Sequence, residues 1–325
     1  MMKGMALHLI TGIAGFIGSS IARALLTQGD RVRGIDNFAT GKKENIAEIR
    51  GDIDFREADL LDATAMRDAC EGVECVFHQA AIPSVPKSVR DPGGSNRANV
   101  DGTVSLLIAA RDAKARRVVY AGSSSAYGDT PTLPKHEEMA PNPISPYAVA
   151  KLAGEYYMTS FFRCYGLETV SLRYFNVFGP RQDPSSPYSG VLARFVTQML
   201  RGEQPTVFGD GTQSRDFTYI DNVVEGNLLA ASTPAEKAAG RMFNVATGRR
   251  VDLNQTFEIL KELTEYSGSL RYAPEREGDI KHSLADISQA ETHLGYKPRV
   301  DFEEGLRRTV EWYREQEAQV LGLRS

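Results

Sequence analysis

The 325-residue chain has few of the residues that bind metals or form disulfide frameworks. It contains 3 cysteines, 5 histidines and 1 tryptophan. The cysteines Cys70, Cys75 and Cys164 form no CxxC pair, and the histidines show no metal-ligand spacing. We therefore expect neither a disulfide scaffold nor a metal site. Such cysteine usage is typical of a reducing, cytoplasmic setting.

An excess of basic charge and long apolar runs are also missing. The net charge is -4, so there is no basic field to attract nucleic acid. No apolar run reaches transmembrane length, so we expect no membrane partner. The first residues place apolar side chains after a lysine, as secretory signals do, but their glycine spacing has another explanation, given below. What is present, 42% hydrophobic residues and 29 glycines, is an ordinary globular composition.

Short apolar runs alternate with helical patterns through the first half of the chain. This alternation is typical of a parallel sheet with helices on both faces. We therefore predict an α/β fold with a Rossmann-type doubly wound parallel sheet. The predicted strands are 6–10, 31–36, 53–59, 75–81, 117–123 and 168–175, and the predicted helices are 16–28, 62–70, 99–113 and 146–165.

The pattern changes after residue 175. The stretch 176–190 is rich in Pro, Ser and Gly and is predicted to be a loop. Predicted helices follow at 191–201 and, near the end of the chain, at 302–317. We therefore predict a second, smaller C-terminal α/β domain. The expected division is a dinucleotide-binding domain of 1–173, to which 218–247 returns, and a substrate domain of 174–217 and 248–325.

A glycine-rich turn, TGIAGFIG, joins the first predicted strand to the first helix. Gly12 permits a tight turn, Gly15 lets a pyrophosphate approach the helix N-terminus, and Gly18 lets the helix and strand pack closely. Asp36 ends the second strand, where a carboxylate accepts hydrogen bonds from an adenosine ribose and repels a 2'-phosphate. These features predict binding of NAD rather than NADP.

Other strand ends point to the same crevice, because ligands lie beyond the carboxyl ends of parallel strands. Asp59 and Leu60 end the third strand, where an acid can meet the adenine amino group. The fourth strand runs into HQAAIPS, where the small residues Ala80 and Ala81 leave space beside the backbone. The fifth strand ends in AGSSSAYG, which places three serines, 123–125, at this edge.

The stretch SPYAVAK contains a tyrosine four residues before a lysine. Ser145 is a good N-cap and Pro146 suits the first helical position, so Tyr147 and Lys151 are expected one turn apart on one helix face. A lysine ammonium beside a phenol favours the phenolate and lowers its pKa, which would provide a base near neutral pH.

Taken together, these motifs resemble the extended short-chain dehydrogenase/reductase family, specifically its nucleotide-sugar 4-epimerases. The resemblance spans nearly the whole chain and is closest to the UDP-N-acetylglucosamine 4-epimerases. It is carried by TGIAGFIG, DNFATG, HQAA, NVDGT, SSSAYG, SPYAVAK, LRYFNVFGPRQDP, SRDFTYIDN and REGDIKHSLADISQA.

The resemblance implies three groups of site residues. The implied catalytic residues are Ser123, Tyr147 and Lys151, with Tyr147 as acid/base. The implied NAD-binding residues are Gly12, Gly15, Phe16, Ile17, Gly18, Asp36, Asn37, Phe38, Thr40, Gly41, Asp59, Leu60, Gln79, Ala80, Ala81, Asn99, Tyr147, Lys151 and Phe175. The implied substrate-binding residues are Ser84, Ser123, Ser124, Tyr147, Asn176, Gly190, Val191, Arg215, Arg276, Asp279 and Ser283.

The implied reaction is inversion at C4 of a UDP-hexose through a transient 4-keto sugar. The resemblance implies that the residue at position 283 forms a wall of the sugar pocket. Family members with a bulky tyrosine at this position are restricted to unmodified hexoses. The small serine therefore favours UDP-GlcNAc and UDP-GalNAc, with UDP-Glc and UDP-Gal as further substrates. The chain departs from 4,6-dehydratases, which carry Asp-Glu where Ser124 and Ser125 stand. Enzymes that decarboxylate a uronic acid usually also need an acidic residue at these positions, where this chain has serines.

Two other functions stay open from the sequence. One is epimerisation of UDP-glucuronate or of a UDP-N-acetylhexosaminuronate, since Arg181 or Lys87 can face a carboxylate. The other, of a different class, is a non-catalytic NAD-binding regulatory protein. The resemblance also implies a homodimer formed through helices 99–113 and 146–165.

Overall fold

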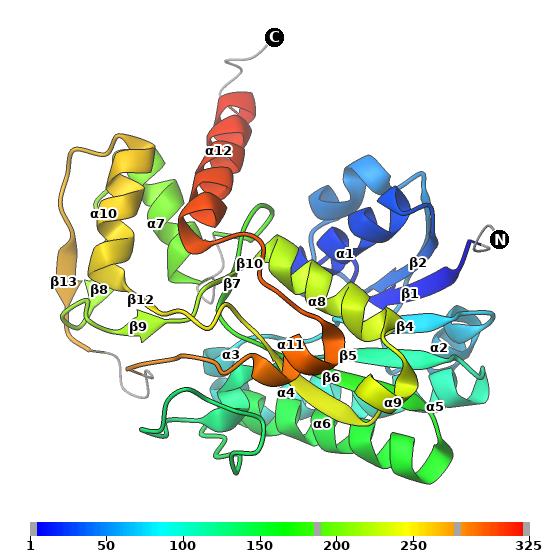
Figure 1. Ribbon diagram of the computed structural model, residues 1–325. Helices are drawn as coiled ribbons and strands as arrows, with labels where there is room; N and C mark the ends of the chain where they lie inside the picture. Colours follow the sequence, from blue (N-terminus) through cyan, green and yellow to red (C-terminus); the bar gives the residue numbers. More distant parts are fainter. Residues whose placement is uncertain (1–4, 185–189, 276–280, 321–325) are drawn as a thin grey trace.

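A sheet of seven parallel strands forms the centre of the molecule. The computed structural model describes residues 5–184, 190–275 and 281–320. The strand order β11-β6-β5-β4-β1-β2-β3 places a switch in winding direction between β1 and β4, where ligands bind in doubly wound sheets (Figure 1). The strands are β1 (Leu7–Thr11), β2 (Arg31–Asp36), β3 (Ile53–Glu57), β4 (Cys75–His78), β5 (Arg117–Ser123), β6 (Glu168–Tyr174) and β11 (Arg241–Val245).

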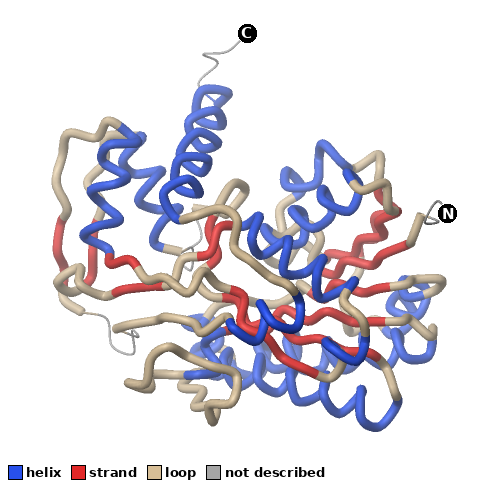
Figure 2. The backbone as a smooth tube through the Cα atoms, in the orientation of Figure 1, coloured by secondary structure: helices blue, strands red, loops and turns tan. Residues whose placement is uncertain are grey.

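Helices cover both faces of this sheet (Figure 2). α1 and α8 contact each other on one face, and α2, α5 and α6 cover the other. Neighbouring strand residues serve opposite faces: Ile10 packs into the core with α1 and α8, and Leu9 into the core with α2, α5 and α6. Strands buried on both faces are therefore apolar along their length. The helices are α1 (Phe16–Thr27), α2 (Ala63–Cys70), α5 (Gly102–Asp112), α6 (Pro146–Tyr165), α8 (Ile220–Ser232), α9 (Ala235–Ala238) and α11 (Ser288–Leu294).

A second group of elements lies beyond the carboxyl ends of the sheet strands, where the chain leaves β6 and β11 (Figure 1). Its helices α7, α10 and α12 pack against one another. Three two-stranded pairs accompany them: β8 with β13, β9 with β12, and β7 with β10. These elements are β7 (Val177–Phe178), α7 (Val191–Leu200), β8 (Thr206–Phe208), β9 (Ser214–Arg215), β10 (Thr218–Tyr219), β12 (Val251–Asp252), α10 (Leu253–Thr264), β13 (Arg271–Ala273) and α12 (Phe302–Val320).

The predicted secondary structure is wrong in two places. The helix predicted at 99–113 begins earlier and is irregular, because α3 (Val85–Arg90), α4 (Pro92–Asn96) and a π turn at Arg97–Asp101 lead into α5. The stretch 176–190, predicted as loop, contains β7, which exists because β10 pairs with it from a distant part of the chain.

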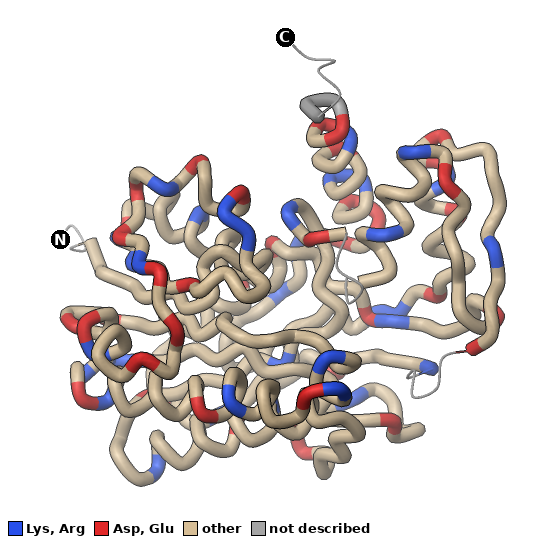
Figure 3. Tube along the Cα trace, turned by 180° about the vertical axis from the view of Figure 1, so that it is seen from behind, with Lys and Arg blue, Asp and Glu red and all other residues tan. Residues whose placement is uncertain are grey.

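Charged residues of both signs are interspersed over the molecule, and Figure 3 shows no region of a single sign. In the part of the chain that the structure describes, no helix is long and apolar enough to cross a membrane. The same residues include no group of three His, Cys, Asp or Glu side chains placed to hold a metal ion.

Candidate active site

The glycine turn fits tightly between β1 and β4. Gly12 has a φ of +70°, and a Cβ there would lie 2.7 Å from the main-chain N and Cα of Ala80. A Cβ on Gly18 would lie 2.2 Å from the carbonyl oxygen of Gly12. Gly15 caps α1 without any side-chain hydrogen bond, and the first turn of α1 holds no acidic residue. The amide groups at this helix end are therefore suited to a pyrophosphate.

Asp36 lies buried at the end of β2, where the sequence predicted a ribose-binding carboxylate. It accepts hydrogen bonds from the main-chain N–H groups of Ala14, at 2.9 Å, and Phe38, at 2.8 Å. Burial raises the pKa of Asp36, and these hydrogen bonds oppose the rise. A Cβ on Gly41 would lie 2.8 Å from the same carboxylate, so the loop from Asn37 through Thr40 to Gly41 folds directly over it.

Further predicted residues line up along the neighbouring strand ends. Asn37 donates to Asp59 at 2.7 Å, beyond β2 and β3. Gln79 hydrogen bonds to Tyr174, beside Ala80 at the end of β4. Asn99, inside the π turn, accepts from the N–H of Ile82 at 2.8 Å and so fixes the chain just after β4. Leu60 is buried, whereas Ala81 is partly exposed.

A buried histidine connects these strand ends, and the sequence reasoning missed it. His78 contacts the hydroxyl of Thr11 at 2.7 Å and that of Thr103 at 2.8 Å, and Thr103 donates to the carbonyl of Asn99. Burial lowers the pKa of His78 to about 3, so the ring is uncharged. His78 ends β4, directly before Gln79, and this position at the ligand-binding end of the sheet could have identified it. The histidines had been considered only as metal ligands.

The structure brings Ser123, Tyr147 and Lys151 together. Ser123 ends β5, Tyr147 opens α6, and a hydrogen bond between their side chains acts on the Tyr147 phenol. Ser123 also contacts Ser125 at 2.8 Å, while Ser124 is partly exposed beside them. Two serines of the run therefore form one hydrogen-bonded unit next to the predicted acid/base.

The expected lowering of the tyrosine pKa is absent from the structure. Burial raises the pKa of Tyr147, and the hydrogen bond with Ser123 opposes the rise only in part. Lys151 donates to the carbonyl of Ala121 at 2.9 Å, and burial lowers its pKa to about 8. Loss of water around the buried phenol therefore decides the direction of its pKa shift.

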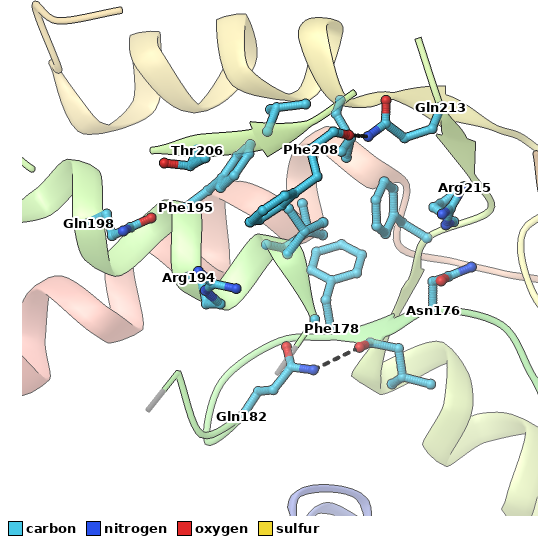
Figure 4. A pocket seen from close by; sticks show the side chains of 17 residues that line it. Asn176, Phe178, Gln182, Arg194, Phe195, Gln198, Thr206, Phe208, Gln213 and Arg215 are labelled. Atoms are coloured by element: carbon cyan, nitrogen blue, oxygen red, sulfur yellow. Dashed lines mark hydrogen bonds between the residues drawn. The ribbon is translucent and has the colours of Figure 1, made fainter. Parts of the chain in front are cut away.

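A cavity lies among β7, β8, β9 and α7, and the chain that leads into it leaves the sheet next to Ser123 (Figure 4). Tyr174 pairs with Ser123 in the sheet, and Asn176, two residues further, lines the cavity. Arg215 lines it as well and donates to the carbonyls of Ser214 and Lys281, at 3.0 Å each. The N–H of Ser283 donates to the carbonyl of Ser214 at 3.0 Å, which places Ser283 beside this arginine. Gly190 and Val191 also belong to the lining.

Several lining residues were not predicted. Gln182 donates to the carbonyl of Val177 at 3.1 Å, and Phe208 presents an aromatic ring to the same space (Figure 4). They come from separate short elements, so local spacing did not connect them. The remaining unpredicted lining residues are Val177, Phe178, Leu192, Arg194, Phe195, Gln198, Thr206, Val207, Gln213, Phe217 and Leu253.

The other predicted residues have varied positions. Phe175 is fully buried against Tyr127. Ser84 caps α3 by accepting from the N–H of Lys87 at 3.0 Å, which engages the hydroxyl predicted to meet the sugar. Arg276 and Asp279 lie outside the described residues. Phe16 and Ile17 form the first residues of α1, at the predicted pyrophosphate site.

Comparison with known proteins decides the family. The model of the "NAD dependent epimerase/dehydratase family" matches residues 8–246. The chain belongs to this family. A relative named "Putative UDP-glucose 4-epimerase" from Methanocaldococcus jannaschii is 39% identical over 308 residues, 94% of this chain and 97% of the relative.

Two solved structures are similar over almost their full lengths. The UDP-N-acetylglucosamine 4-epimerase from Methanobrevibacter ruminantium M1, in complex with UDP-N-acetylmuramic acid, has 41% identity and a TM-score of 0.92, covering 97% of this chain and 100% of that one. The UDP-glucose 4-epimerase from Thermotoga maritima, with UDP-glucose, has 40% identity and a TM-score of 0.91, covering 96% and 99%.

This family member is thus an isomerase, an NAD-dependent UDP-sugar 4-epimerase, and the alternative of a non-catalytic regulatory protein is set aside. The residues present fit NAD, since α1 has an uncapped N-terminus at Gly15 and a buried acid, Asp36, stands at the end of β2.

Proposed function

We propose that the enzyme interconverts UDP-GlcNAc and UDP-GalNAc, and also accepts UDP-Glc and UDP-Gal. The observation that carries this choice is the small side chain of Ser283, whose N–H binds the carbonyl of Ser214, next to the cavity-lining Arg215. One similar protein is named a UDP-glucose 4-epimerase and another a UDP-N-acetylglucosamine 4-epimerase. Both names support a pocket that accepts a hydroxyl or an acetamido group at C2 of the sugar.

The cavity is the proposed site of the UDP moiety. Asn176 and Arg215 hold the diphosphate, because amide and guanidinium groups donate to phosphate oxygens. The ring of Phe208 offers a flat surface for the uracil, with Gly190 and Val191 at its border. Arg276 and Asp279 keep their predicted roles at the diphosphate and ribose.

The sugar reaches the sheet edge, where this chain moves a proton. Tyr147 removes the proton of the 4-hydroxyl, assisted by Ser123, and returns it after the 4-keto sugar has turned about its bond to the diphosphate. Lys151 contacts the nicotinamide ribose and supplies positive charge. When bound, NAD would supply the hydride chemistry at C4.

A uronate substrate is less well supported. Arg181, one of the two cations considered for its carboxylate, lies close to Arg23 of α1 and to Tyr219 and Asp221 at the start of α8. Lys87, the other, lies on α3. The preference for a neutral hexose therefore rests on Ser283.

The substrate assignment is tested with paired sugars. We expect the parent enzyme to turn over UDP-GlcNAc and UDP-Glc, and Ser283→Tyr to lose UDP-GlcNAc activity selectively. Ser267→Tyr, at an exposed position, is the matched control. Equal relative rates in the parent and Ser283→Tyr would refute the proposal. Deuterium at C4 should remain in the product, because the same hydride returns.

A homodimer is part of the proposal. Exposed apolar side chains lie on α5 and α6 of the same monomer, among them Ile108, Val149, Tyr156 and Tyr157, 40–60% exposed. A second copy would cover this face, as large apolar patches usually mark an interface. Light scattering of the parent and of Tyr156→Glu tests this; a monomeric parent contradicts it. Cytoplasmic location stays a prediction.

A further inference from the structure

A buried acidic residue follows Lys151 by one turn of α6. The side chain of Glu155 is 6% exposed and that of Arg173, on β6, 3%. Arg173 donates from Nε to both carboxylate oxygens, at 3.0 and 3.2 Å, and from Nη2 to one of them at 2.7 Å. Burying such a pair costs much of what its attraction gains, so stability alone is weak grounds for its presence.

The carboxylate lies against the strand that leads to the active site. A Cβ on Gly122 would lie 2.9 Å from Oε1 of Glu155, so this position has room only for glycine. The residue before it, Ala121, accepts the hydrogen bond from the Lys151 ammonium. The residue after it is Ser123. The ammonium and the carboxylate of α6 therefore meet successive residues of β5.

Groups from three strands surround Lys151. His78 from β4 is uncharged, since burial lowers its pKa to about 3. Tyr120 from β5 has its ring 4.9 Å from the Lys151 ammonium, and burial raises the pKa of its phenol. Arg173 from β6 pairs with Glu155, and Tyr147 precedes Lys151 on α6.

Glu155 is the described carboxylate whose charge acts on Lys151. Burial lowers the pKa of Lys151 to about 8, and the negative charge of Glu155 opposes this. Burial also raises the pKa of Glu155, and the hydrogen bonds and charge of the Arg173 guanidinium oppose the rise.

Arg173 is fixed from its other side by a second set of contacts. Its guanidinium carbon lies 4.4 Å from the ring centre of Tyr127, on the turn after the serine run. Tyr127 donates to Asn244 of β11 at 2.7 Å, and the N–H of Asn244 donates to Glu137 at 2.8 Å. Arg173 is thus held in place independently of Lys151, so Glu155 is held too.

We propose that Glu155 is a positioning residue that acts through Lys151: its carboxylate, locked by Arg173, supplies the counter-charge that keeps the buried ammonium protonated and directed at the end of β5. This inference rests on the proposed function, in which Lys151 must be positive to support Tyr147.

The same two strands carry a second ion pair at their opposite end, between a buried arginine and a partly exposed glutamate, which serves as a control. Arg117 of β5 binds Glu168 of β6 with 2.6 Å between Nη2 and Oε2, and the arginine side chain is 1% exposed. Arg117 also donates to the carbonyls of Ala230 and Thr233. This pair stabilises the sheet but lies far along β5 from Ser123.

The test is a direct titration of Lys151 in the NAD-loaded protein. Lysine labelled with ¹³C at Cε reports the ammonium by its chemical shift, and the Lys151→Met variant assigns the signal. We expect Glu155→Gln to lower the titration midpoint of Lys151 by about one pH unit, the effect of removing one close opposite charge. Glu168→Gln should leave the midpoint unchanged. If Glu155→Gln does not fold, the double variant Glu155→Gln/Arg173→Gln leaves no unpaired buried charge, and its midpoint should also be lowered.

The pH profile of kcat/KM provides the second measurement. Activity should fall as pH rises through the Lys151 midpoint, so the alkaline limb should move to lower pH with the midpoint in Glu155→Gln and stay in place in Glu168→Gln. An unchanged Lys151 midpoint in the Glu155 variants overturns the inference, as does an equal shift in Glu168→Gln. A parent that epimerises no UDP-sugar while the midpoint shifts would instead contradict the proposed function, and the two failures are thus distinguishable.

Discussion

The two halves of the site are built in different ways. On the dinucleotide side, main-chain groups and glycines at neighbouring strand ends form the surface, as at Gly12, Gly18 and Ala80. On the nucleotide-sugar side, side chains from short separate strands do so, as with Arg215 and Phe208. In the proposed function, backbone shape therefore holds the cofactor, whereas exchangeable side chains set the choice of substrate.

Removing the group between the two halves should have the largest effect. Tyr147→Phe keeps the ring and loses the phenol that exchanges a proton, so we expect kcat to fall roughly 1000-fold. NAD content and UDP affinity should be unchanged, as each half is intact. A parental rate in this variant would contradict the acid/base assignment.

A methyl group on the dinucleotide side should have the next largest effect. In Gly18→Ala the new Cβ would lie 2.2 Å from the carbonyl oxygen of Gly12, which forces the turn and α1 apart. We expect roughly 100-fold weaker NAD binding, the equivalent of about 3 kcal/mol of overpacking. NAD released on denaturing the purified protein is measured by mass spectrometry.

The control is Gly51→Ala, since a Cβ there meets nothing within 4 Å. Equal NAD content in the two variants would show that the tight turn is not what holds the dinucleotide.

The arrangement of residues could be predicted where it depends on local spacing. The glycine turn joins β1 to α1, Asp36 ends β2, and Tyr147 and Lys151 share α6, so spacing alone indicated where they lie. Gln182 and Phe208 could not be placed this way, because β7 and β8 form only when β10 and β13 pair with them. The raised pKa of Tyr147 was missed because burial of the phenol depends on the whole fold.

A change on the nucleotide-sugar side should affect substrate and spare the cofactor. Arg215→Met removes a guanidinium at the cavity, and hydrogen bonds to charged groups contribute about 2 kcal/mol. We expect roughly 30-fold weaker UDP binding by calorimetry, with full NAD content. Arg250→Met, an exposed neighbour, should bind as the parent does. Loss of NAD from Arg215→Met would contradict the view that the two halves bind their ligands independently.

The smallest effect is expected for an ion pair that connects the halves. Lys42, next to the loop over Asp36, lies 2.8 Å from Asp183, which follows β7. Because both side chains are partly exposed, the pair should contribute less than about 1 kcal/mol. Lys42→Met should therefore change NAD content and KM by less than about fivefold. A larger change would mean that the two halves are coupled.

The position of β11 has a consequence for synthesis on the ribosome. β6 ends at Tyr174, yet its outer neighbour β11 begins only at Arg241, after much of the second group of elements has been translated. Until then β6 leaves a row of backbone N–H and C=O groups unpaired, the kind of strand edge that other chains join. Chaperone protection during this interval, or a pause in translation, would matter more for this protein than for one whose sheet is completed in order.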